Sequence, residues 1–172
     1  MLPNNLLYKL VQEALGKEVI ENYEESFTNR LLVQKLVYMF QELNQIKRYE
    51  YSWYLAGPYS KKLTSQIYNM VLFLDENDKR QWSQLRFSSK GQDYIKKVTD
   101  FFKVDEAELK EYNLTKSDWF ELMASLYYLK QRDKIKDKDI LVNSLLKAKD
   151  KFRLEQIKFA VDKYGNRLGF AA

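Results

Sequence analysis

Tyr54-Leu55-Ala56-Gly57-Pro58-Tyr59-Ser60 joins a run of alternating aromatic residues to a capped helix. Before it, Tyr49, Tyr51 and Trp53 recur at the two-residue period of a half-buried strand. Glycine adopts backbone angles that other residues resist, and proline fixes its own φ, so a sharp turn is expected at Gly57-Pro58. Ser60 is then placed to cap a helix that reaches residue 74.

Two helices are expected before this stretch. The first begins at Asn4 or Asn5 and ends at Gly16, because glycine is a common helix terminator. The second begins at Ser26 or Thr28, and apolar residues cover much of its circumference. We therefore expect this second helix to be central to the fold.

The residues that follow the stretch predict a turn, a strand and another helix. Asp75–Asp78 has the composition of a polar turn, and Trp82–Phe87 alternates like a short strand. A helix capped by Ser88 or Ser89 is expected to end near Lys103. The order helix, helix, strand, helix, strand, helix suits a winged-helix-like core, with Trp82–Phe87 contributing to the wing.

The rest of the chain predicts only helices, among them one capped by Ser117 and one capped by Asp137. No Pro- or Gly-rich linker separates this part from the first. We expect a single compact domain over residues 1–172, with a winged-helix-like core at 1–103 and a helical extension at 104–172 packed on it. The predicted fold class is mainly α with a small β component, a winged-helix-like N-terminal core packed on a C-terminal helical bundle.

Composition argues against several classes of protein. Five glycines and two prolines are too few for the frequent turns of a sandwich or barrel. Without cysteine or histidine, thiolate metal sites, a cysteine nucleophile and the usual general base are absent. Asp75, Glu76 and Asp78 lack the glycine and distal glutamate of a calcium loop. We therefore predict no enzyme, no cofactor and no metal site.

The chain also lacks recognisable membrane and export signals. Its first residues do not follow the order of a signal peptide, and no apolar run approaches the roughly 20 residues that span a bilayer. These absences predict a cytoplasmic protein that does not enter a membrane.

Positive charge is concentrated in the middle of the chain. Residues 45–103 carry eleven basic and six acidic side chains, whereas residues 1–44 carry four basic and six acidic ones. An anionic partner is expected to dock in this middle part. Ordinary solvated charge is the alternative interpretation.

The Gly-Pro stretch allows a structural and a functional interpretation. In the structural one it only redirects the chain and its rings are core. In the functional one the helix N-terminus after Ser60 attracts a phosphate or carboxylate. The polar side of that helix, including Gln66, contacts the bases of DNA, and the wing contacts the phosphate backbone. The candidate binding residues are Tyr54, Gly57, Pro58, Tyr59, Ser60, Lys61, Lys62, Ser65, Asn69, Arg86 and Lys90.

Three stretches resemble a known family: Val33–Tyr38, Tyr51–Ser60 and Trp119–Leu129. They are similar to the YwgA-like proteins and the related Panacea-domain proteins, which include SocA-like antitoxins. In these prokaryotic families a Leu-Gln-Lys-Leu-type helix precedes an aromatic strand and a Gly-Pro turn, although Val33 stands where leucine is usual. The resemblance implies a helical domain with few strands, no established catalytic residues and action through protein partners.

The leading hypothesis is a noncatalytic binding or regulatory module of the Panacea and YwgA type. It engages a protein partner or DNA through the surface that flanks Gly57-Pro58 and the helix after Ser60, in a toxin-antitoxin, phage-related or regulatory setting. Two alternatives remain open, a winged-helix DNA-binding transcription regulator and an enzyme of unknown chemistry. The sequence does not decide whether the chain forms a homo-oligomer.

Overall fold

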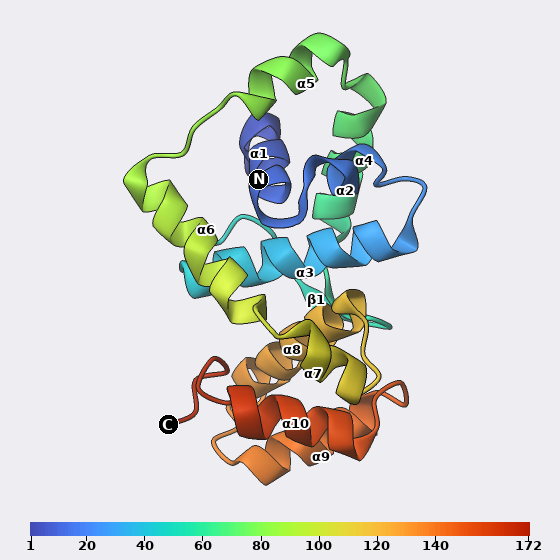
Figure 1. Ribbon diagram of the computed structural model, residues 1–172, viewed down its shortest axis with the longest axis vertical. Helices are drawn as coiled ribbons and strands as arrows, with labels where there is room; N and C mark the ends of the chain where they lie inside the picture. Colours follow the sequence, from blue (N-terminus) through green and yellow to red (C-terminus); the bar gives the residue numbers. More distant parts are fainter. The chain divides into compact units, whose positions relative to one another are not determined.

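The computed structural model describes residues 1–172 and is mainly helical (Figure 1). None of its helices combines the length and the apolar character needed to cross a membrane. The elements are α1 (Asn4–Leu15), α2 (Lys17–Glu21), α3 (Phe27–Leu43), β1 (Ser52–Tyr54), β2 (Gly57–Tyr59), α4 (Lys61–Phe73), α5 (Glu76–Ser83), α6 (Ser89–Phe102), α7 (Glu106–Glu111), α8 (Lys116–Arg132), α9 (Lys138–Ala148) and α10 (Leu154–Tyr164). The predicted fold class, mainly α with a small β component, is confirmed.

The chain forms two compact units. The first contains Met1–Ser52 and Tyr59–Asp100, and the second contains Trp53–Pro58 and Phe101–Ala172. The first unit therefore holds α1 to α5 and most of α6, and the second holds α7 to α10 together with the tip of the β1–β2 hairpin.

The two strands form a hairpin in the stretch that sequence analysis singled out. They pair with each other in a two-stranded sheet, and the connection of only Leu55 and Ala56 makes them antiparallel. The turn predicted at Gly57-Pro58 thus lies two residues earlier, and both of these residues belong to β2. Gly57 has a φ of 86°, which lets the chain rejoin the ladder directly after the turn, as glycine does in a G1 bulge.

The predicted wing strand is wrong. Trp82 lies in the last turn of α5, and Gln84–Ser88 form no strand. Asp75 explains the error, because its side chain accepts a hydrogen bond from the N–H of Asp78 at 2.7 Å and so starts a helix where a polar turn was expected. The winged-helix arrangement is therefore not confirmed.

Helix α3 is buried over most of its length, as expected for a central helix. Ser26 caps it and Ser60 caps α4, both as predicted. Two buried glutamines two turns apart on α3 clamp the backbone of single residues. Gln34 accepts a hydrogen bond from Ser60 N and donates to Ser60 O, at 3.0 and 3.1 Å. Gln41 does the same for Tyr49, at 3.1 and 3.0 Å.

These clamps fix both ends of the segment that carries the hairpin. We predict that Gln41→Leu lowers the free energy of unfolding by about 2–4 kcal/mol, because it orphans both the N–H and the C=O of Tyr49. Gln34→Leu should cost less, about 1–3 kcal/mol, since Ser60 O also accepts from Thr64 N. Urea denaturation measures both.

Gln131→Leu is the matched control, because Gln131 is exposed and its loss should change stability by less than about 0.5 kcal/mol. If the clamp variants behaved like this control, the two amides would not hold the segment.

Helix α8 forms the core of the second unit. It starts at a capping box in which Thr115 and Asp118 exchange hydrogen bonds, so the cap lies two residues before the predicted Ser117. Trp119 is fully buried and donates from Nε1 to Phe102 O at 2.9 Å. The ring of Phe102 stacks on Phe120 at 3.9 Å. This packing makes α8 a fixed platform for the polar groups that it carries.

Candidate functional site

The hairpin tip exposes two large side chains. Leu55 is 85% exposed and Tyr54 is 57% exposed. Trp53, in contrast, packs its ring against Tyr128 of α8 at 5.7 Å between centroids. The tip is thus held on one side by an aromatic contact and presents an apolar surface on the other.

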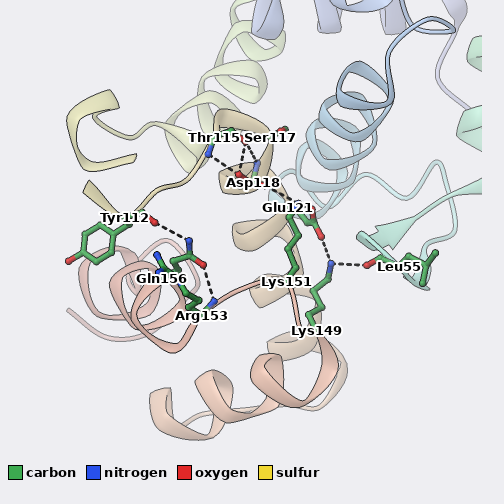
Figure 2. Close-up of polar contacts among 10 residues, drawn as sticks. All are labelled: Leu55, Tyr112, Thr115, Ser117, Asp118, Glu121, Lys149, Lys151, Arg153 and Gln156. Carbon is green, nitrogen blue, oxygen red and sulfur yellow. Dashed lines mark hydrogen bonds and ion pairs between the residues drawn. The ribbon is translucent and has the colours of Figure 1, made fainter. Parts of the chain in front are cut away.

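A buried lysine holds the tip by its backbone. Lys149 donates from Nζ to Leu55 O at 2.9 Å (Figure 2). The same ammonium lies 5.8 Å from the ring centroid of Trp53. The Lys149 side chain is only 4% exposed. Because this buried ammonium engages the turn carbonyl, the backbone of the tip is fixed.

The charge of Lys149 is balanced by Glu121 of α8. The two side chains form an ion pair, and the Glu121 side chain is only 2% exposed. Burial lowers the pKa of Lys149, although the hydrogen bond and the charge of Glu121 oppose this shift. The ion pair gives the buried ammonium and the buried carboxylate each a partner of opposite charge.

A second lysine completes a charged cluster. Lys151 contacts Glu121 Oε2 at 2.6 Å and Asp118 Oδ1 at 2.9 Å. Burial acts to lower the pKa of Lys151, but its bonds to Glu121 and Asp118 outweigh this effect and raise it. We call Asp118, Glu121, Lys149 and Lys151 the charged cluster. Its two carboxylates and two ammonium groups cancel in charge.

A cavity of about 490 Å³ lies between the tip and the charged cluster. Its volume falls in the range of ligand-sized sites, and most of the surface exposed within it is apolar. Asp150, at its rim, is exposed and forms no ion pair. Because the charged cluster is neutral overall, Asp150 gives this rim one uncompensated negative charge. The lining residues are Trp53, Tyr54, Leu55, Glu121, Ala148, Lys149, Asp150 and Lys151.

The candidate residues from the sequence divide between the two units. Tyr54, Gly57 and Pro58 belong to the second unit, and only Tyr54 of these lines the cavity, since Gly57 and Pro58 are buried in β2. The remaining candidates belong to the first unit: Tyr59, Ser60, Lys61, Lys62, Ser65, Asn69, Arg86 and Lys90.

On α4, the exposed side matches the predicted polar side only in part. Lys61, Lys62, Ser65 and Asn69 are exposed. Gln66 is not available to a ligand, because it accepts a hydrogen bond from Tyr49 Oη and donates to Leu2 O and Asn4 Oδ1. Ser60 is buried and serves as the helix cap. Arg86 and Lys90 are exposed but lie on no wing.

Sequence reasoning missed the three central groups of the site, Glu121, Lys149 and Lys151. Glu121 lies in a helix whose aromatic residues indicate a buried core element. Its lysine partners follow 28 and 30 residues later. One signal was present, since Lys149-Asp150-Lys151 places three charges between the end of α9 and the buried ring of Phe152.

Nowhere in the chain do three acidic side chains gather closely enough to hold a metal ion. No family model, no curated protein and no solved structure matched the chain in the comparisons with known proteins. What the site can do must therefore be argued from its own geometry.

The lowered pKa of Asp118 predicts that the free energy of unfolding decreases in acid. Burial raises its pKa, but hydrogen bonds from Thr115 and Lys151 outweigh burial and bring the pKa below the usual value. The unfolded chain therefore takes up the proton first as the pH falls. The stabilisation is complete above about pH 4 and is lost as the pH drops through the lower folded pKa.

We predict that Asp118→Asn is less stable than the natural chain at pH 7 and that the difference shrinks as the pH falls below about 4. Urea denaturation across this range measures it. Asp162→Asn, at an exposed position outside any ion pair, is the control. A difference between Asp118→Asn and the natural chain that stayed constant with pH would contradict the prediction.

Proposed function

We propose that this chain is a noncatalytic binding module that docks a protein partner on the hairpin tip and its cavity. One observation carries the proposal: Leu55 is 85% exposed on a turn whose backbone is fixed by a buried ammonium. Exposing a leucine to water is unfavourable by itself, and fixing its backbone removes the entropy loss that a partner would otherwise meet.

The cavity supports a partner of defined chemistry. A segment with an apolar side chain next to a basic one fits, because the apolar group can enter beside Ala148 and Trp53 while the cation pairs with Asp150. Glu121 and Lys149 are less suited to catalysis, since each is occupied by the other. The noncatalytic role also agrees with what the resemblance to YwgA-like and Panacea-domain proteins implies.

The test is affinity capture from cells of the source organism with a tagged chain. The natural chain should retain a specific protein, and Leu55→Asp should lose it. Ile140→Asp is the matched control, because Ile140 is another large exposed apolar residue of the second unit, at 59% exposure, and does not line the cavity. Equal capture by Leu55→Asp and the natural chain would refute the proposed surface.

DNA binding is a second candidate, favoured by the first turn of α4. Lys61 and Lys62 are exposed there and no acidic residue accompanies them, although the positive end of the helix dipole disfavours lysine at this position. A phosphate at this end would relieve that repulsion.

For this candidate we expect duplex DNA to bind with an affinity that falls steeply with salt, and Lys61→Glu/Lys62→Glu to abolish binding. Fluorescence anisotropy at several salt concentrations measures both. A flat, negligible response of the natural chain would rule this candidate out.

A further inference from the structure

The first unit contains a second cavity, of about 630 Å³, that the proposed partner surface does not use. One face of α6 forms a wall of it through Gln92, Ile95, Lys96 and Thr99, which follow helical spacing. Lys9 and Glu13 of α1 and the Ser83–Phe87 segment supply the other walls. In Figure 1 the chain between α5 and α6 passes along one side of α1.

Lys9 builds the floor of this cavity. Its residue is only 7% exposed, and its ammonium contacts Ser83 O at 2.7 Å, Glu13 Oε1 at 2.7 Å and Gln12 Oε1 at 3.3 Å. All three donors are engaged, so Lys9 ties the Ser83–Phe87 segment to α1. It does not offer a hydrogen bond to a ligand, and it neutralises Glu13.

Two other cations are available to a ligand. Arg86 is exposed and makes no hydrogen bond or ion pair, so its planar guanidinium can take a carboxylate or phosphate in a bidentate manner. Lys96 pairs with Asp100 one turn along α6, but both side chains are more than half exposed. Such a pair contributes little and is easily exchanged for a ligand anion.

The remaining lining is suited to an apolar body. Leu85, Phe87 and Ile95 are half-buried and contribute hydrophobic surface, while Gln84 and Thr99 add neutral hydrogen-bonding groups. With Lys9 paired to Glu13 and Lys96 paired to Asp100, Arg86 is the uncompensated charge of the cavity, and Lys96 adds a second cation when its exposed pair opens.

We propose that this cavity binds a small organic anion, a carboxylate or phosphate ester on an apolar or aromatic body. Arg86 and Lys96 hold the anionic group, and Leu85, Phe87 and Ile95 contact the body. This site is independent of the partner surface, since it lies wholly in the first unit.

The test uses 8-anilinonaphthalene-1-sulfonate, an aromatic anion whose fluorescence rises in apolar surroundings. Its parent amine N-phenyl-1-naphthylamine, which lacks the sulfonate, is the neutral reference. The natural chain should bind the sulfonate, and Arg86→Glu/Lys96→Glu should weaken that binding about tenfold or more while changing the affinity for the neutral amine by less than about twofold.

Arg80→Glu/Lys90→Glu is the matched control. It changes the net charge equally at two exposed positions outside the cavity, so its affinity for the sulfonate should stay within about twofold of the natural chain. Equal weakening by both double variants, or by neither, would overturn the proposal. Amide chemical-shift changes in the natural chain provide a second readout, and changes centred outside residues 9–13 and 83–99 would also overturn it.

Discussion

Replacing Glu121 with leucine is expected to lower the free energy of unfolding by about 3–5 kcal/mol. The Glu121 and Lys149 side chains are 2% and 4% exposed, so removing the carboxylate leaves an ammonium buried without its counter-charge. Lys151 loses one of its two carboxylate partners, but it is 46% exposed and can regain water. Chemical denaturation monitored by circular dichroism measures the loss.

A double variant separates the pair from the rest of the cluster. Lys149→Met alone should also be strongly destabilising, whereas Glu121→Leu/Lys149→Met should lose much less than the two single losses combined, because no buried charge is left over. Glu155→Leu, which breaks the exposed Arg153–Glu155 pair, is the control and should cost less than about 1 kcal/mol. Additive losses at positions 121 and 149 would contradict the account of a coupled buried pair.

Leu55→Asp is expected to weaken binding of the captured partner about 100-fold, which corresponds to about 2.7 kcal/mol. The carboxylate would have to be desolvated at the centre of the contact, next to the negative charge of Asp150. Stability should change by less than about 0.5 kcal/mol, because the side chain is exposed and only its carbonyl is held by Lys149. Isothermal titration calorimetry with the purified partner gives the affinity.

Three outcomes would count against this prediction. If Ile140→Asp weakened binding as much as Leu55→Asp, the loss would reflect charge in general. If Leu55→Asp bound normally, the tip would not be part of the interface. A large loss of stability in Leu55→Asp would show that the side chain has a structural role, contrary to its exposure.

Local signals predicted much of the fold. Ser26, Ser60 and Asp137 cap the helices that were expected to begin there, since a short polar side chain before an apolar repeat is a local feature. The wing prediction also rested on a local signal, but it was wrong. Six alternating residues are weak support for a strand when Asp75 offers a helix cap upstream. The alternation favoured a strand and the cap at Asp75 favoured a helix, and the helix formed.

The candidate site was harder to predict than the fold. The stretch around the hairpin was found from its aromatic alternation and glycine, but the groups that fix it come from α8 and from the residues after α9. Pairings across 28 and 30 residues leave no periodic pattern. Gln34 and Gln41 were more accessible to prediction, since a polar residue repeated after two turns on a buried helix face needs a partner.

Photo-crosslinking reports whether the hairpin tip itself contacts a partner. A photoreactive benzophenone amino acid would replace Leu55 in one chain and Ile140 in another, both expressed in cells of the source organism. We expect a crosslinked partner from position 55 and none from position 140. Crosslinking from position 140 alone, or from neither position while the natural chain still captures its partner, would contradict it.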